Sequence, residues 1–395
     1  MKQNTEGFIP FSRPSIGKEE EEAVLKVLRS GWLTTAGETA AFEEEFARYL
    51  GVPYALAVNS ATAGLHLSLE ALNLPPDTPV ITTPYTFAAT AEVIRYVSCR
   101  PVFADIGEDS CNIDPVEIER TAAGLKNAPG AVIPVHIAGE PCRIENILSV
   151  TASANIPVIE DAAHALPAVT SRGPAGTVGK TGVFSFYATK NITTGEGGMV
   201  VTSEKNMAAR MKLMRLHGID RDIWDRYTGN KKASWYYQVR EAGFKYNMGD
   251  IAAALGRVQL RKCGEFHKRR KEIAAKYRSA LAGLEYLTIP KDTEGHSWHL
   301  FIISLKPEYL QISRDDFMER LRDLNIGTSL HFIPLHIMPY YRKKYGYAPS
   351  DFPRALRRYQ NSLSLPLYPD LTDFEAERVC RAVKAIGDGA YKRYY

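Results

Sequence analysis

The hydrophobic positions near the start of the chain recur at helical spacing. Residues 18–30 and 38–50 both show this period, and in the second segment Phe42 and Phe46 share one face while Gly51 marks the end. The pattern predicts two amphipathic helices.

After residue 51 the pattern changes to short apolar runs that alternate with helix-length segments. The runs are YALAV (54–58), PVITT (79–83), PVFADI (101–106), AVIPVH (131–136), PVIED (157–161), VFSF (183–186) and GMVVT (198–202). Strands separated by helices predict an α/β fold with a mainly parallel sheet that is flanked by helices on both faces. Ligands of such sheets bind beyond the carboxyl ends of the strands, so we look for functional residues there.

The last third of the chain has a different pattern of hydrophobic positions. A long helical pattern begins near residue 247 and continues to about residue 284, and mixed short runs with a further helix near 314–325 follow it. We therefore predict a large α/β domain over residues 1–250, which includes the N-terminal segment. A long linking helix and a smaller α+β domain are predicted over residues 251–395.

Composition narrows the class of protein. The chain has 395 residues, 45% hydrophobic and 24% charged, with a net charge of +4. These values are typical of a globular protein, and no basic run with interleaved aromatics indicates nucleic-acid binding. No apolar stretch of about 18 residues predicts membrane insertion. The 5 cysteines form no CxxC pair, so we expect reduced thiols in the cytoplasm and no metal site.

The stretch FSFYATKNITTGEGGMV (184–200) places one lysine just after an apolar strand. A buried Lys190 would lose its proton readily and act as a nucleophile toward a carbonyl group. Ser185 could donate a hydrogen bond to a phosphate, and the glycines at 195, 197 and 198 permit close backbone approach. The alternative is a solvated lysine in a glycine-rich hairpin.

The stretch VIEDAAHA (158–165) ends another strand with a carboxylate. Asp161 is expected to be buried, so its charge needs a partner, for which a protonated ring nitrogen is suitable. His164 follows closely and is placed to touch the same ligand. The alternative is a helix-capping aspartate beside a core histidine.

Two further strand ends carry residues suited to a cofactor. The segment NSATAG (59–64) begins a helix whose free N–H groups favour an anion, although Ser60 or Thr62 could simply cap that helix. Phe87 follows the strand PVITT and could stack on an aromatic ring, or it could be a core residue. A phosphate anchor, a stacking ring, an aspartate and a lysine are together what pyridoxal phosphate requires.

These motifs resemble those of the DegT/StrS family of sugar aminotransferases, which have the type I fold of aspartate aminotransferase. The resemblance extends over nearly the whole chain. Its segments are GWLTTAGETAAFEEEFARYLG (31–51), NSATAGLHL, TPYTF, IEDAAHA, FSFYATKNITTGEGG, GFKYNMGDIAAALGRVQL (243–260) and SLHFIPLHIMPYY (329–341).

The resemblance implies a role for each matching residue. Lys190 would bind pyridoxal phosphate covalently and move the proton, and Asp161 would pair with the pyridine nitrogen. The implied cofactor-binding residues are Ala61, Thr62, Phe87, Asp161, His164, Ser185, Lys190 and Asn247. In this family the residue corresponding to Asn247 reaches the cofactor of the neighbouring subunit, which implies a homodimer with shared active sites.

The resemblance also implies the substrates: L-glutamate as amino donor and a nucleotide-linked ketosugar, here a UDP-linked 4-keto sugar, as acceptor. Surface-polysaccharide, lipopolysaccharide or amino-sugar biosynthesis would use the product. The implied substrate-binding residues are Trp32, Thr34, Thr35, Arg226 and His331. One alternative is a sugar dehydratase or lyase on the same scaffold, which carries histidine in place of the lysine. A non-catalytic ligand-binding regulator, which would lack cofactor residues, is the other.

Overall fold

A seven-stranded sheet forms the centre of the N-terminal part of the molecule. The computed structural model describes residues 7–220 and 236–392. The strands are β1 (Tyr54–Val58), β2 (Pro79–Thr82), β3 (Arg100–Phe103), β4 (Ala131–Ile133), β5 (Ile159–Asp161), β8 (Thr181–Ser185) and β9 (Gly198–Thr202). Hydrogen bonding gives one group in the order β3-β2-β4 and another in the order β5-β8-β9-β1. Parallel bridges from Val132 to Val158 and from Val135 to Asp161 join the two groups.

The sheet is mainly parallel, as the alternating pattern predicts. The exception is β9, which runs antiparallel to both β1 and β8. The chain connects β8 to β9 through residues 186–197 without a helix, and this segment returns the chain in the opposite direction, whereas a parallel neighbour needs a crossover that is usually helical.

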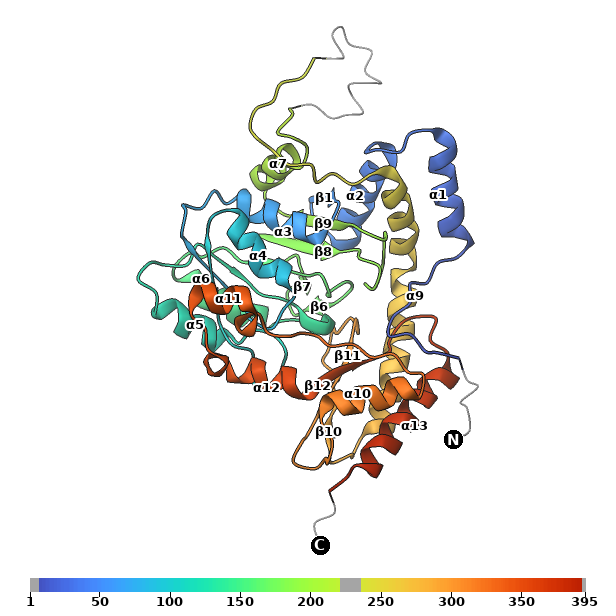
Figure 1. Cartoon of the computed structure of the whole chain (residues 1–395). Coiled ribbons are helices and arrows are strands. Elements are labelled where there is room, and N and C mark those ends of the chain that lie inside the picture. The colour runs from blue at the N-terminus through green and yellow to red at the C-terminus, as the bar shows by residue number, and fades with distance from the viewer. Residues whose placement is uncertain (1–6, 221–235, 393–395) are drawn as a thin grey trace.

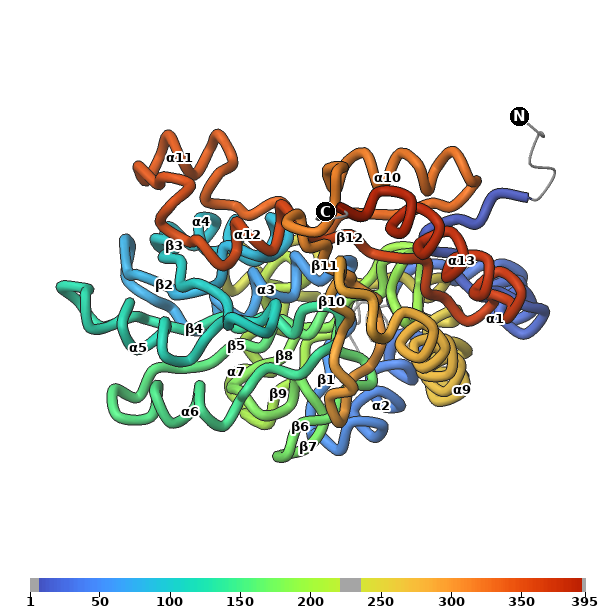
Figure 2. Tube along the Cα trace, turned by 90° about the horizontal axis from the view of Figure 1, so that it is seen from below, coloured from blue at the N-terminus to red at the C-terminus, as the bar shows by residue number. Residues whose placement is uncertain are grey.

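Helices cover both faces of this sheet (Figures 1 and 2). Alternate strand residues point to opposite faces, so Val183 packs in one core cluster and Phe184 in another. Helices α3 (Ala61–Glu70), α4 (Ala88–Tyr96) and α7 (Lys205–Met214) contribute to the Val183 cluster. The opposite face is covered by α2 (Gly37–Leu50), α5 (Pro115–Ala123), α6 (Ile144–Ala152) and the first part of α9 (Asp250–Leu281).

Gly64 sets the distance between α3 and the sheet. A Cβ atom at this position would lie 2.7 Å from Val183 and 2.8 Å from Val200, closer than side chains tolerate. The glycine therefore lets the helix lie directly on β8 and β9. Its N-terminus is thereby fixed beside the end of β8.

The C-terminal part packs on a three-stranded antiparallel sheet in the order β10-β11-β12. Its elements are β10 (Leu287–Thr288), β11 (Phe301–Leu305), α10 (Arg314–Asp323), α11 (Pro339–Tyr345), α12 (Pro353–Asn361), β12 (Ser362–Leu365) and α13 (Asp373–Gly389). Ile9 packs in this same core and pairs with Ile326, so the N-terminal segment lies with the C-terminal part. A division at residue 250 stays a prediction.

The remaining elements are short or peripheral. They are α1 (Lys18–Ser30), which packs against α9, the two-stranded pair β6 (Val169–Thr170) and β7 (Gly173–Pro174), and 3₁₀ turns at Ile137–Gly139, Leu335–Ile337 and Pro349–Asp351. Within residues 7–220 and 236–392, no helix is both long and apolar enough to cross a membrane.

Candidate active site

A cavity of about 450 Å³ lies beyond the carboxyl ends of β5 and β8, at the N-termini of α3 and α4. It brings together eight residues that the sequence singles out. These are Ala61, Thr62, Phe87, Asp161, His164, Ser185, Lys190 and His331. The placement agrees with the general location of ligand sites in α/β sheets.

Lys190 lies on the wall of this cavity and is only partly exposed. Burial lowers the pKa of its ammonium group to about 8, against the opposing effect of the Asp161 charge. A lysine with this pKa has a much larger neutral fraction near physiological pH than an ordinary lysine, which makes it a competent nucleophile. The alternative of a solvated hairpin lysine is wrong.

Asp161 ends β5 and is 4% exposed. One carboxylate oxygen accepts a hydrogen bond from Thr90 Oγ1 at 2.8 Å, and the other accepts one from the Ala163 N–H at 3.2 Å. Burial raises the pKa of this carboxyl group, although Thr90, Ala163 and the charge of Lys190 each act to lower it. These hydrogen bonds compensate only part of the cost of burying the carboxylate. The group therefore remains suited to pair with a cationic atom of a ligand in the cavity.

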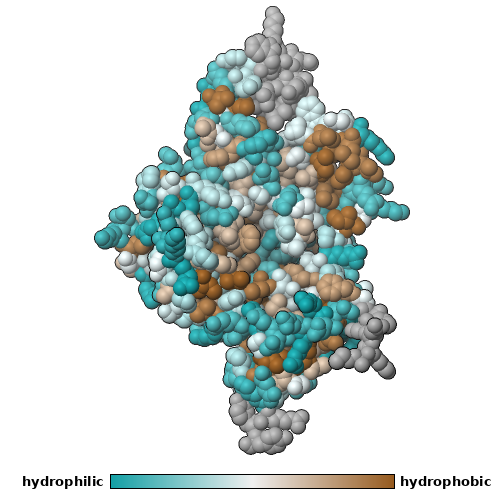
Figure 3. Space-filling model, viewed as in Figure 1, coloured by the Kyte–Doolittle hydropathy of each residue, from teal (hydrophilic) through white to brown (hydrophobic). Residues whose placement is uncertain are grey.

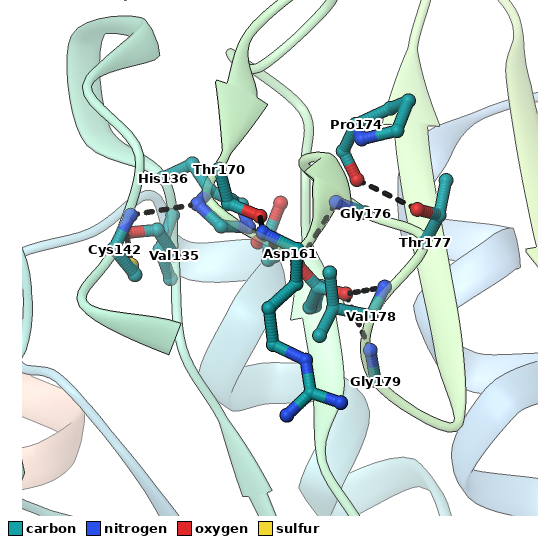
Figure 4. A network of polar contacts seen from close by, with 12 residues as sticks. Val135, His136, Cys142, Asp161, Thr170, Pro174, Gly176, Thr177, Val178 and Gly179 are labelled. Carbon is teal, nitrogen blue, oxygen red and sulfur yellow. Dashed lines mark hydrogen bonds and ion pairs between the residues drawn. The ribbon is translucent and has the colours of Figure 1, made fainter. Parts of the chain in front are cut away.

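The neighbouring Glu160 points to the other side of β5 and fixes the strand. It accepts hydrogen bonds from the N–H groups of Gly176, Val178 and Gly179 at 2.6–2.8 Å (Figure 4). His136 Nε2 adds a fourth at 2.9 Å, while His136 Nδ1 accepts from the Cys142 N–H at 3.0 Å. The backbone N–H of His136 also donates to the backbone carbonyl of Asp161 at 3.1 Å, so the network holds the backbone of Asp161 in place.

Three imidazoles line the cavity with the lysine: the buried His164 and His299 and the partly buried His331. Burial together with the charge of Lys190 lowers the pKa of His331 to about 4 and those of the other two well below the usual value. His164 Nδ1 accepts a hydrogen bond from the Ala138 N–H at 3.3 Å, which places its remaining proton on Nε2. The rings of His164 and His299 lie 4.4 Å apart. All three are neutral at physiological pH.

The N-terminus of α3 provides an anion site. Ser60 is the helix cap, as one alternative from the sequence holds, and its hydroxyl accepts the Ala63 N–H at 3.1 Å. The cap leaves the N–H groups of Ala61 and Thr62 at the cavity wall, where the helix dipole favours a phosphate. Gly198 lies against this turn, since a Cβ atom there would be 2.7 Å from the Ala61 nitrogen.

Phe87 is available for ring stacking. Its side chain is 64% exposed although it lines the cavity, so the alternative of a core aromatic is wrong. Its ring centroid lies 6.3 Å from that of Phe332. An exposed phenyl ring at a cavity wall is suited to cover one face of an aromatic ligand.

The other residues implied by the resemblance lie elsewhere. Trp32, Thr34, Thr35 and Asn247 are not part of the wall of this cavity. Thr35 and Asn247 instead contact each other, since Asn247 Nδ2 donates to Thr35 Oγ1 at 2.6 Å. Arg226 lies outside the described residues. Their implied roles, in binding substrate or the partner's cofactor, stay predictions.

Among the wall residues that the sequence reasoning did not assign to the site are Thr90, His299 and Phe332. Thr90 stands one helical turn after Phe87, and that spacing could have indicated a shared face. His299 has no local signal. Its Nδ1 donates to Asn191 Oδ1 at 3.1 Å across a separation of 108 residues, and packing of the C-terminal part brings it there.

The donor set fits one cofactor class. An anion-binding helix end, an exposed phenyl ring, a buried carboxylate and a lysine of low pKa line a single cavity. This arrangement defines a pyridoxal-phosphate-dependent enzyme of the type I fold.

The chain belongs to the DegT/DnrJ/EryC1/StrS aminotransferase family, whose model matches residues 14–384. It is 43% identical over 393 residues to the spore coat polysaccharide biosynthesis protein SpsC of Bacillus subtilis, covering 99% of this chain and 100% of SpsC. The PMP form of Spr1654 from Streptococcus pneumoniae superposes with a TM-score of 0.88 at 30% identity, covering 96% and 99% of the two chains. DesI, solved in the presence of its TDP-sugar product, gives a TM-score of 0.85 at 30% identity and coverage of 97% and 94%. The chain is a pyridoxal-phosphate-dependent sugar aminotransferase.

Proposed function

We propose that the enzyme transfers the amino group of L-glutamate to a nucleotide-linked ketosugar, namely a UDP-linked 4-keto sugar, in surface-polysaccharide, lipopolysaccharide or amino-sugar biosynthesis. The observation that carries the proposal is Lys190, with its pKa lowered to about 8, in the same cavity as the buried Asp161. The retained lysine gives no support to the dehydratase alternative, and the seven implied cofactor residues that line one cavity give none to a non-catalytic regulator.

The residues of this chain divide the work among them. Bound pyridoxal phosphate supplies an aromatic ring that withdraws electrons from the substrate carbon that bears nitrogen. Asp161 would hold a proton on the ring nitrogen. Lys190, in its neutral form, would take the proton from that carbon of the donor and deliver it to carbon C4′ of the cofactor, and would carry it in the reverse direction for the acceptor sugar. Phe87 would cover one ring face and keep water from it, and the turn at Ala61 and Thr62 would hold the phosphate.

The support for the proposed sugar acceptor is less specific than the support for the cofactor. The names of SpsC and DesI connect those proteins with polysaccharide biosynthesis and with a TDP-linked sugar. In this chain His331 lines the cavity, and its Nδ1 lies 2.8 Å from Ser364 Oγ, which orients the ring. A neutral imidazole held in this way suits hydrogen bonding to sugar hydroxyls. We propose His331 as a sugar contact.

We further propose that the enzyme is a homodimer with shared sites, acting in the cytoplasm. Among the described wall residues, Lys190 is the only lysine or arginine, so the phosphates of a nucleotide sugar need cations from elsewhere. An exposed apolar patch over α1 and the following turn, formed by Leu25, Leu28 and Leu33, suits a partner surface (Figure 3). All 5 cysteines are free thiols, in keeping with a reducing compartment.

The absorption spectrum of the purified enzyme tests the donor half of the proposal. The band of the lysine-bound cofactor should fall when L-glutamate is added, and the band of the amine form should replace it. A panel of nucleotide-linked ketosugars should then restore the first band, with the UDP-linked 4-keto sugar the most effective. A spectrum unchanged by glutamate would contradict the choice of donor, and restoration by a different nucleotide sugar would correct the acceptor.

Replacement of Asn247 by alanine tests the shared site. Cofactor retention during gel filtration should fall in Asn247→Ala, whereas the exposed Asn127→Ala should retain cofactor like the wild type. Equal retention by Asn247→Ala and the wild type would contradict a role for Asn247 at the partner's cofactor.

A further inference from the structure

A second cavity, of about 320 Å³, lies apart from the candidate active site and shares no wall residue with it. Residues 108–111 and 137–140 form one side, and β10, β11 and α12 form the other. The elements β10, β11 and α12 lie next to one another in Figure 1. Its volume is at the lower end of the roughly 300–1,000 Å³ that small-molecule sites occupy.

Arg358 brings an uncompensated positive charge to this cavity. It makes no ion pair or hydrogen bond with any residue in the described ranges, whereas its helix neighbours are paired. Arg354 lies 3.1 Å from Asp114, and Arg357 lies 2.5 Å from Glu108. A guanidinium directed at a cavity without a carboxylate partner is suited to bind the anionic group of a ligand.

Glu140 brings the opposite charge to the same cavity. Its carboxylate oxygens accept hydrogen bonds from Ser110 at 3.0 Å and Thr293 at 3.5 Å, and within the part of the chain described here it forms no ion pair. Burial raises the pKa of this carboxyl group, while the charges of Arg358 and Lys291 lower it. Arg358 is thus close enough to act on Glu140 electrostatically but does not contact it. A cation and an anion that share a cavity without touching are complementary to a zwitterion.

Apolar side chains also contribute to the wall of this cavity, beside its charged residues. Ile289, Leu300, Ile302 and Leu305 contribute to the wall. We propose that this cavity binds a free α-amino acid with an apolar side chain. Its carboxylate would pair with Arg358, its ammonium group with Glu140, and its side chain would pack against Leu300 and Ile302.

An amino acid bound there would touch the wall that separates the two cavities. Ala138 lines the second cavity, and its N–H donates to Nδ1 of the active-site His164 at 3.3 Å. Leu300 also lines the second cavity, donates from its N–H to the Ala138 carbonyl at 3.1 Å, and follows His299 in the chain. The ligand therefore contacts the segments that position two imidazoles of the active site.

Calorimetric titration of the holoenzyme with N,N-dimethyl-L-leucine tests the proposal. This tertiary amine keeps the zwitterion but cannot condense with the cofactor, so binding is read without any contribution from transamination. We expect saturable binding to the wild type and to Lys190→Ala alike. N-acetyl-L-leucine, which lacks the ammonium group, should bind at least about tenfold more weakly, a loss of about 1.4 kcal/mol.

Variants locate the site. Arg358→Gln and Glu140→Gln should each weaken N,N-dimethyl-L-leucine at least about tenfold. The control Arg320→Gln, which changes an exposed residue of α10, should bind like the wild type. A circular-dichroism melt accompanies each variant, and Arg358→Lys, which keeps the charge, supplies a second test if Arg358→Gln fails to fold.

Three results would overturn the proposal. These are no saturable binding to the wild type at up to about 10 mM, equal affinity in the wild type and folded Arg358→Gln, and equal affinity for the acetylated compound. None of them depends on whether the enzyme transaminates.

Discussion

Glu160 and Asp161 are adjacent carboxylates on β5, both nearly inaccessible to solvent, and they face opposite sides of the strand. Glu160 accepts four hydrogen bonds, from His136, Gly176, Val178 and Gly179. Burial would raise its pKa, but these donors hold the pKa below its usual value. Asp161 accepts bonds from Thr90 and Ala163, and burial raises its pKa.

The difference shows two uses of a buried charge. A carboxylate whose donors are supplied by the fold stabilises the fold, because its desolvation is compensated in the folded state. A carboxylate left partly uncompensated costs stability and retains capacity for a ligand. The Glu160 side of β5 is therefore expected to control stability, and the Asp161 side to control activity.

The largest effect is expected at Lys190, which lines the same cavity as Asp161. Lys190→Ala should abolish transamination, because no other lysine lines the described cavity wall. Its unfolding free energy should stay within about 1 kcal/mol of the wild type, since burial disfavours the charged form of this lysine. Turnover and thermal melts check both statements. Lys180→Ala, which removes an ion pair with Glu204 at 3.3 Å, should leave activity unchanged.

Asp161→Asn should separate activity from stability on the cavity side. We expect kcat to fall about 10²–10³-fold, the usual result of removing one electrostatic contact with the reacting system. Unfolding free energy should not decrease, because a buried charge with a raised pKa is replaced by a neutral group. A variant that loses stability as well as activity would place Asp161 with Glu160 as a structural residue.

Glu160→Gln should give the opposite result. The amide group can accept fewer bonds and places its own N–H groups against backbone donors, so the unfolding free energy should fall by about 3 kcal/mol. Denaturant unfolding measures this loss. The exposed Glu204→Gln, whose ion pair is on the surface, should change stability by less than about 1 kcal/mol.

The pH dependence of cofactor binding sharpens the role of Asp161. The neutral form of Lys190 is the nucleophile, so the rate at which apo-enzyme binds pyridoxal phosphate should rise about tenfold per pH unit and level off near pH 8. The charge of Asp161 acts to raise this pKa, so the midpoint should move to lower pH in Asp161→Asn. A wild-type midpoint at the ordinary lysine value would contradict the burial of Lys190.

The smallest effect is expected at Thr90. Its hydroxyl donates to Asp161 at 2.8 Å, and this bond lowers the aspartate pKa. Thr90→Val should therefore reduce kcat several-fold, equivalent to about 1 kcal/mol. Thr151→Val, which removes a buried bond to the Ile147 carbonyl in α6, is the matched control. Thr151→Val should lose about as much stability as Thr90→Val and keep full activity.

Much of the fold could be predicted because it depends on local periods. The predicted helix at residues 18–30 is observed at Lys18–Ser30, and the long helix predicted at 247–284 at Asp250–Leu281. The sequence could not show that Gly198–Thr202 runs antiparallel, because its hydrophobic pattern does not depend on strand direction.

The site could be predicted where its residues end strands. Lys190, Asp161 and Phe87 follow buried apolar runs, and their chemistry is unusual at such positions. His299 could not be found in this way, because its place beside Asn191 depends on packing between segments far apart in sequence. The compensation of Glu160 was equally hidden, since three of its four donors are backbone groups of the turn at residues 176–179 and the fourth is the ring of His136.

The most direct test of the account is to identify the lysine that binds the cofactor. Borohydride reduction of the holoenzyme, followed by proteolysis and mass spectrometry, locates the residue that carries the pyridoxyl group. The account predicts that this group is on Lys190 alone and is missing from Lys190→Ala treated in the same way. A pyridoxyl group on any other lysine of the wild type would contradict the assignment of this cavity as the active site.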